Sequence, residues 1–142
     1  TNGFIYEHDT GNDFDGSNIL ARYATPDFDY GDLGTLKTLH YLKVSMNTEG
    51  IVEPDVSIKF DYNSANVQQP SDPFDLGVIN PPAVFGEAVF GSNIFGGLNN
   101  PSIRIPLQGS GSSNSFTFTS EDTKPSYTIN GIYVDFIPSG RR

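Results

Sequence analysis

The spacing of apolar residues is the strongest constraint on the fold of this chain. Apolar residues fall at i, i+3, i+4 and i+7, the spacing that gathers them on one face of a helix, in only one window, that of Ile129, Ile132, Tyr133 and Phe136. The 142 residues instead include 15 Gly, 10 Pro, 11 Phe and 7 Tyr, together with many β-branched residues. The sequence therefore predicts an all-β chain.

The clearest strand is VSIKFDY, in which every second residue is apolar. The residues expected on its buried face are Val56, Ile58, Phe60 and Tyr62. A second stretch, 36–46, alternates more loosely, and NTEG at 47–50 lies between the two as a turn signal. We expect these strands to form a hairpin.

Further strands are expected at 3–8, 18–24, 102–108, 115–120 and 126–137. The last two have the spacing of an antiparallel pair. In the final strand the apolar residues change parity at Asn130-Gly131, which predicts a β-bulge that keeps both sets on one face. GSGSSNS at 109–115 is expected to be a Gly/Ser hairpin loop. These elements predict one domain over 1–142, an antiparallel β-sandwich or jelly-roll-like fold with long loops.

Composition excludes several functional classes. The net charge is −9, from 8 Lys and Arg against 17 Asp and Glu, which disfavours sequence-specific binding to nucleic acid. Cysteine is absent, so thiolate catalysis, disulfides and thiolate-bound zinc are excluded. No apolar run has the roughly 20 residues of a membrane span, and we expect a soluble chain. Its first residue is Thr1, which fits a processed chain, a truncated one or a piece of a longer polypeptide.

Two acidic stretches are candidates for chemistry. HDTGNDFDG at 8–16 offers Asp9, Asp13 and Asp15 as oxygen ligands for calcium, but it lacks the EF-hand spacing. A turn whose Asp side chains bond their own backbone is the favoured interpretation. PDFDYGDLG at 26–34 carries carboxylates that could serve as a glycosidase pair, yet a solvated acidic loop is favoured there too. No catalytic residue, enzymatic activity or cofactor is predicted.

An aromatic repeat stands out in AVFGEAVFGSNIFGG, residues 83–97. An apolar residue followed by Phe-Gly recurs there at Phe85, Phe90 and Phe95. A period of five suits neither a strand nor a helix. We expect a linking segment that folds back, with its rings placed either in this domain's own sandwich or in a groove of a neighbouring chain. The terminal Arg141 and Arg142 could likewise bind a neighbouring subunit or an anion, or form a solvated tail.

Two stretches together resemble tail-tube and nozzle-type structural proteins of short-tailed bacteriophages. In FIYEHDTGNDFDGSNILARYATPDFDYGD, a Tyr and a charged residue precede an acidic Asp-Gly turn, a strand and a closing Gly-Asp. IRIPLQGSGSSNSFTFTSEDTKPSYTINGIYVDFIPSGRR is similar to the closing part of the same proteins, where an Asp-containing last strand ends in Gly-Arg-Arg. The two stretches cover about half of the chain, and the aromatic-Gly repeat between them matches the family in style.

The resemblance implies a virion structural domain in a tube, nozzle or neck ring of a phage tail, soluble before assembly. Its partners would be copies of itself and neighbouring tail or connector proteins, and the chain would be the C-terminal part of a longer one. The residues expected at the interface are Phe85, Phe90, Phe95, Arg141 and Arg142. A carbohydrate- or receptor-binding β-sandwich of the adhesin or fibre-tip type is the alternative, and a hydrolase using Asp29 or Asp32 is a remote third.

Overall fold

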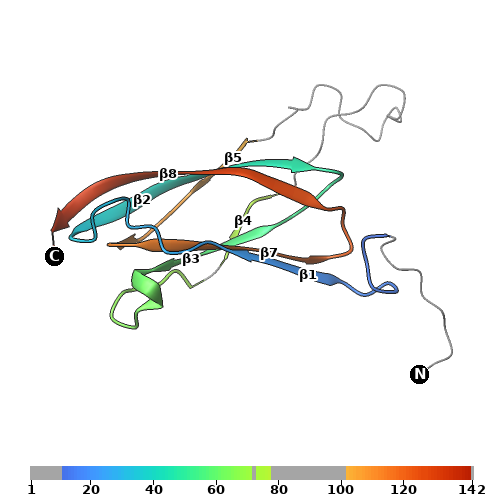
Figure 1. Cartoon of the computed structure of the whole chain (residues 1–142), viewed down its shortest axis with the longest axis horizontal. Coiled ribbons are helices and arrows are strands. Elements are labelled where there is room, and N and C mark those ends of the chain that lie inside the picture. Colours follow the sequence, from blue (N-terminus) through green and yellow to red (C-terminus); the bar gives the residue numbers. More distant parts are fainter. Residues whose placement is uncertain (1–10, 72, 78–101, 142) are drawn as a thin grey trace.

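The computed structural model of this chain describes residues 11–71, 73–77 and 102–141. Within them the chain forms two antiparallel sheets that pack face to face (Figure 1). The strands of the first sheet are, in spatial order, β1 (Ile19–Ala24), β7 (Asn114–Asp122), β3 (Asp55–Phe60) and β4 (Phe74–Asp75). The predicted all-β sandwich is confirmed.

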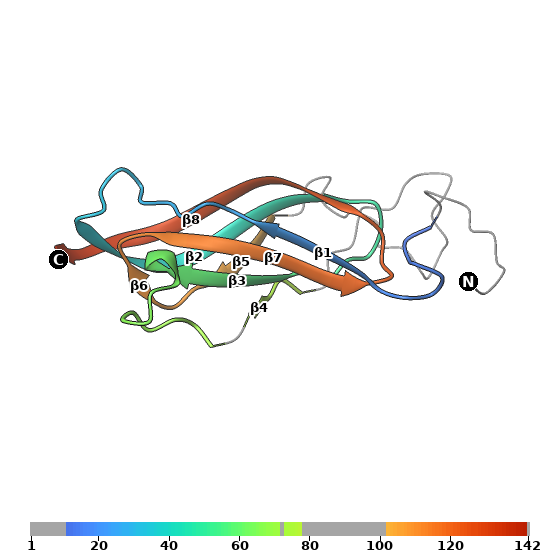
Figure 2. The same ribbon diagram turned by 60° about the horizontal axis from the view of Figure 1, so that its bottom comes forward.

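The second sheet is built around β2 (Thr35–Thr48). Strand β8 (Tyr127–Arg141) pairs along the whole of one edge of β2. Strands β5 (Ser102–Pro106) and β6 (Ser110–Gly111) pair one after the other along the opposite edge. The turned view in Figure 2 shows β8 and β1 on the same side of the sandwich, both running toward the end that holds the C-terminus.

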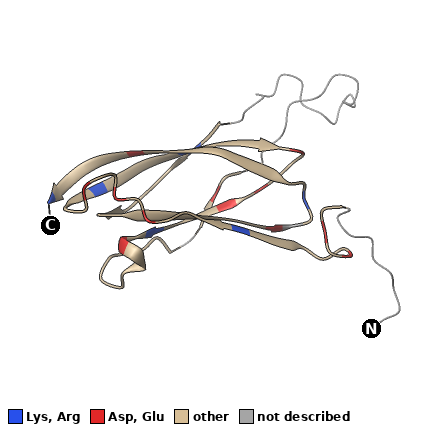
Figure 3. Ribbon diagram, viewed as in Figure 1, with Lys and Arg blue, Asp and Glu red and all other residues tan. Residues whose placement is uncertain are grey.

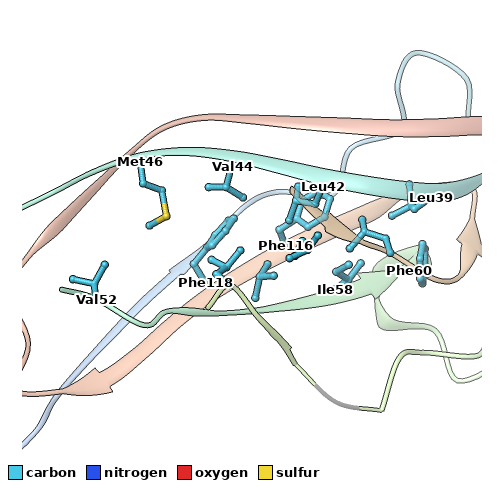
Figure 4. Close-up of a cluster of buried hydrophobic side chains, with 13 residues drawn as sticks. Leu39, Leu42, Val44, Met46, Val52, Ile58, Phe60, Phe116 and Phe118 are labelled. Atoms are coloured by element: carbon cyan, nitrogen blue, oxygen red, sulfur yellow. The ribbon is translucent and has the colours of Figure 1, made fainter. Parts of the chain in front are cut away.

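The core lies between β2 on one side and β3 and β7 on the other (Figure 4). Their alternating apolar residues are almost completely buried: Leu42, Val44 and Met46 from β2, Val56, Ile58 and Phe60 from β3, and Phe116 and Phe118 from β7. Each strand therefore presents one apolar face to the other sheet, as the alternation predicts.

Both predicted strand pairings are wrong. Strand β2 belongs to the second sheet and β3 to the first, so residues 49–54 carry the chain between sheets and form no hairpin. Strand β7 pairs with β1 and β3, and β8 pairs with β2. The two connections are tied together where Glu49 N–H donates to Ser126 O at 3.1 Å and Ser126 Oγ donates to Glu49 Oε2 at 2.7 Å. The alternation of apolar and polar residues specifies which face of a strand is buried, but it does not determine which strand lies next to it in the sheet.

Strand β3 ends earlier than the sequence predicts, whereas the predicted bulge in β8 is present. Strand β3 stops at Phe60, because Asp61–Asn63 adopt positive φ in a short 3-10 turn. Tyr62, predicted on the buried face, is consequently 68% exposed, and Asp61 is buried in its place. The predicted bulge in β8 is confirmed: Ser45 pairs with Gly131 and Met46 with Ile129, which leaves Asn130 as the extra residue.

The predicted Gly/Ser hairpin loop is a buried crossing between the sheets. Ser110–Gly111 form β6 in the second sheet, and Asn114 begins β7 in the first. Between them, Ser112 and Ser113 are 5% and 1% exposed. A Cβ on Gly111 would lie 2.7 Å from the Phe60 ring, so glycine permits the close approach.

Two buried charged side chains hold this crossing. Lys37, 4% exposed, donates from Nζ to the carbonyl oxygens of Ser112 at 2.8 Å and Asp29 at 2.6 Å, and also to that of Asp32. Asp61 Oδ1 accepts hydrogen bonds from the N–H groups of Ser112 at 2.7 Å and Ser113 at 3.0 Å. Lys37 of the second sheet thus bonds the Ser112 carbonyl oxygen of the crossing. Asp61, in the turn that follows β3, bonds the N–H groups of Ser112 and Ser113.

The predicted strand 3–8 and the aromatic repeat 83–97 lie outside the described residues. Within the described ranges, no helix combines the length and the apolar character that crossing a membrane requires.

Replacing Lys37 by Met should lower the free energy of unfolding by roughly 2–4 kcal/mol, because buried carbonyl groups lose charged donors while the aliphatic stem is kept. Urea denaturation followed by circular dichroism measures the change. Lys43→Met is the matched control, since Lys43 is exposed on the same strand, and a change within about 0.5 kcal/mol is expected. Equal effects of the two substitutions would contradict a structural role for the Lys37 ammonium.

Candidate functional site

The outer edge of β8 is a candidate contact surface. This 15-residue strand pairs only with β2 among the residues that the structure describes. Its other edge therefore presents backbone N–H and C=O groups to which a further strand could bind. Natural edge strands are commonly protected by proline, bulges or charges. In β8, Pro138 and the bulges at Asn130 and Ser139 interrupt the ends, and residues 131–137 between them contain neither proline nor a bulge and carry one charge, that of Asp135.

The outer face of β8 carries exposed apolar side chains. Ile132, Val134 and Phe136 pack against the core, so Tyr133 and Ile137 point away from it. They are 63% and 51% exposed. Figure 3 shows that the strand is nearly free of charge, with acidic colour at one position and basic colour at its end, which the sequence identifies as Asp135 and Arg141. Tyr133, Asp135, Ile137 and Arg141, with the free backbone edge of β8, are called the β8 surface below.

An ordered aromatic–cation pair lies beside the β8 surface. Arg104 of β5 places its guanidinium 3.7 Å from the centroid of the Tyr41 ring. Tyr41 is the cross-strand neighbour of Asp135, and Lys43 is the neighbour of Tyr133. Because Tyr and Arg are enriched in protein interfaces, this composition suits contact with another protein chain.

A cleft of about 810 Å³ opens along the inner side of β8, between that strand and β1. The apolar residues that line it are Ile19, Ala21 and Tyr23 from β1 and Tyr127, Ile129 and Ile132 from β8. Farther along the same side, Tyr30 closes the gap by packing on Phe136, with ring centroids 4.5 Å apart. Burial raises the pKa of the Tyr30 phenol, and a hydrogen bond with the Asn114 side chain partly offsets the rise.

The acidic candidates act as turn residues wherever they are described. Asp13 Oδ1 accepts a hydrogen bond from Gly16 N–H at 2.7 Å, and Asp29 Oδ1 accepts one from Gly31 N–H at 2.9 Å. Asp15 occupies the turn itself at φ 55°, and Asp9 lies outside the described residues. In the described ranges, no three His, Asp or Glu side chains gather closely enough to hold a metal ion.

Asp32 has the strongest local partners in the second acidic stretch. Its Oδ2 accepts a hydrogen bond from the Thr35 hydroxyl at 2.6 Å, and its Oδ1 accepts one from Gly34 N–H at 2.8 Å. These bonds, in that order of importance, hold the pKa of Asp32 below its ordinary value of 3.8, with smaller electrostatic contributions from Lys37 and Arg141. The Asp32 carboxylate therefore orders the chain that enters β2.

Of the predicted interface residues, the structure describes only Arg141. It lies exposed at the end of β8, opposite Thr35 of β2. Phe85, Phe90, Phe95 and Arg142 lie outside the described residues. Sequence reasoning missed Tyr133 and Ile137. The sequence did contain a sign of them: these two large apolar residues alternate with Ile132, Val134 and Phe136, so they belong to the opposite face of the strand.

Comparisons with known proteins found no matching protein-family model, no matching curated protein and no matching solved structure.

Stability should depend on pH through Asp32. Because its pKa is lower in the folded chain than in the unfolded one, its ionised form stabilises the fold above the ordinary value of 3.8. That stabilisation is lost as the pH falls through the folded-state pKa. Thr35→Val should therefore lower the free energy of unfolding at about pH 7, and lower it less at about pH 2.

Denaturant titrations at both pH values measure this difference. Thr38→Val is the control, because the Thr38 hydroxyl bonds the neutral Ser110 hydroxyl at 2.8 Å and its loss should not depend on pH. A Thr35→Val effect of the same size at both pH values would refute the assignment.

Proposed function

We propose that this chain is a structural subunit of a bacteriophage tail, which acts by contacting other protein chains through its β8 surface. Its partners would be copies of itself in a ring and neighbouring tail or connector proteins. The observation that carries the proposal is the free edge of β8, a 15-residue strand with a strand partner on one edge only within the described chain.

The backbone and side chains of β8 support the same kind of contact. A strand from another chain could bind the free edge through main-chain hydrogen bonds, which give affinity without requiring particular side chains. Specificity would come from the exposed Tyr133 and Ile137, with Arg141 at the strand end as a fork for a carboxylate. Aromatic and Arg side chains are the residue types that most often dominate binding energy in interfaces.

The phage context rests on the sequence. The flanking stretches that resemble tail-tube and nozzle-type proteins include residues 26–32 of the second acidic loop and the whole of β8. The net charge of −9 suits a component near exiting DNA, because an acidic wall repels the phosphate backbone.

One observation favours the alternative of a carbohydrate- or receptor-binding module. A hollow of about 830 Å³ on the β4 side is lined by the polar residues Gln68, Gln69, Gln108 and Ser110 and by the Phe74 ring. Amide groups beside an aromatic ring could bind a polar ligand such as a sugar. The Gln69 amide, however, already bonds the β3 backbone at Phe60, through contacts of 2.7 and 2.9 Å.

The assembly state of the purified chain tests the proposal. Mass photometry and electron microscopy should find closed oligomers. The double substitution Tyr133→Ser/Ile137→Ser should weaken their association about tenfold or more, because it removes exposed anchors of the contact. The free energy of unfolding should change little, since both side chains are already more than half exposed.

Tyr62→Ser/Leu20→Ser is the matched control, because Tyr62, in the turn after β3, and Leu20, on β1, are 68% and 60% exposed. This variant should assemble like the parent chain. A chain that stays monomeric at every concentration and binds glycans on an array would overturn the proposal and favour the alternative.

A further inference from the structure

We propose that two copies of this chain pair about a two-fold axis through Val134, with the outer edge of β8 in one copy antiparallel to the outer edge of β8 in the other. The same axis places the loop at residues 26–34 of each copy over the cleft between β1 and β8 of the other copy. The inference rests on the proposed function, because it names a second copy of the chain as the occupant of the β8 edge.

The part of β8 that is able to pair lies symmetrically about Val134. The bulge at Asn130 precedes it and Pro138 follows it, so residues 131–137 can form a regular ladder between these two interruptions. When this segment pairs with its own copy in the antiparallel sense, an axis at its middle residue uses the whole segment. A shift of the axis in either direction shortens the paired length.

Side-chain direction and charge select the same register. Ile132, Val134 and Phe136 face the core. Only an axis through a residue keeps the inward side chains of both copies on one face of the joined sheet, because an axis between two residues would place inward side chains opposite outward ones. An axis at Asp135 would put two carboxylates directly opposite each other, which is destabilising. An axis at Val134 instead puts Asp135 opposite the second copy's Tyr133.

The two halves of the side between β1 and β8 are complementary in shape. On one half, Tyr30 packs on Phe136, yet its side chain remains 37% exposed. The other half holds the cleft, where Tyr23 stacks on the buried ring of Phe118 and is still 55% exposed. The proposed register places Phe136 opposite the second copy's Ile132, which lines that cleft. The Tyr30 ring of each copy therefore faces the cleft of the other, and apolar surface is removed from water at both places.

The charges of the two halves are also complementary. Two basic residues, Arg22 and Lys124, belong to the described lining of the cleft, and no Asp or Glu does. The Lys124 ammonium forms an ion pair with Glu53 at 2.5 Å. The loop that would face the cleft is acidic and carries Asp27 and Asp29. Because each copy has a net charge of −9, association favours the side where an acidic loop meets a basic rim.

Introduced thiols report the contact directly, because the chain contains no cysteine. Val134→Cys places its thiol on the axis, so the full-length variant should form a disulfide-linked dimer under mild oxidation, in a yield that falls on dilution. Ile132→Cys is the matched control on the same face of the same strand. Its two copies would lie about 13 Å apart along the strands, which is beyond the reach of a disulfide.

Two exposed positions repeat the test without altering the core. A mixture of Tyr133→Cys and Asp135→Cys chains should form mixed disulfide dimers, because the Cα atoms of directly opposed residues lie about 4.5–5.5 Å apart. Neither variant alone should cross-link, since diagonal neighbours lie roughly 7–8 Å apart. Disulfide dimers of Tyr133→Cys alone would overturn the proposed register, even if Val134→Cys failed to fold.

A charge reversal tests the placement of the acidic loop against the cleft. Arg22→Glu should raise the dissociation constant of the dimer about tenfold at low salt, because the rim of the cleft would then repel the loop. Lys59→Glu is the control, since it changes the net charge equally and Lys59 is exposed on β3 of the same sheet. Analytical ultracentrifugation measures both constants. Equal effects of the two substitutions would contradict the placement.

The outcomes separate this inference from the proposed function. Association that depends on Tyr133 and Ile137, without a disulfide at position 134 and without mixed dimers of the 133 and 135 variants, would overturn the two-fold pairing and leave the proposed function standing. A chain that stays monomeric at every concentration would overturn both.

Discussion

The arrangement of the two sheets depends on how the chain crosses between them at Ser112 and Ser113. A crossing segment buries backbone N–H and C=O groups that no strand can pair, and each such group is costly if it stays unsatisfied. Here the Lys37 ammonium donates a hydrogen bond to the Ser112 carbonyl oxygen. The Asp61 carboxylate accepts hydrogen bonds from the N–H groups of Ser112 and Ser113. The crossing can therefore be short. Strand β6 ends beside β2 in one sheet, and β7 begins in the middle of the other.

The same lysine links this crossing to the open side of the sandwich. Its ammonium also binds the carbonyl groups of Asp29 and Asp32, which holds the 26–34 loop in place and puts Tyr30 on Phe136. One half of the side between β1 and β8 is closed in this way, and the other half remains a cleft. Because β2 occupies the centre of its sheet, β8 lies at the margin, and one of its edges has no strand partner among the described residues. The closed half of this side thus depends on Lys37, whereas the exposed edge of β8 follows from the strand order of the second sheet.

The sequence was informative where a residue's environment depends on its own strand. Alternation located the strands of the core, and the change of parity at Asn130-Gly131 located a bulge. It was uninformative about which strands are neighbours, because a strand with one apolar face can pair at its edge or pack across the core. Lys37 shows the same limit: its parity and charge indicate a solvent-facing residue. Only the carbonyl groups of Asp29 and Asp32 in the preceding loop and of the distant Ser112 make its burial possible. At the candidate surface, Arg141 was predicted from the sequence, whereas the free edge beside Tyr133 and Ile137 became apparent only from the pairing of β8.

The central claim is that this chain acts through contacts along β8, and hydrogen–deuterium exchange tests it most directly. Exchange would be compared between the dilute monomer and the assembled protein, peptide by peptide. The account predicts that amides of residues 131–137 with no partner on β2 exchange quickly in the monomer and become protected on assembly, while the amides of β3 and β7 are protected in both states. Unchanged exchange along β8, with new protection confined to another surface such as the 63–71 loop, would contradict the account.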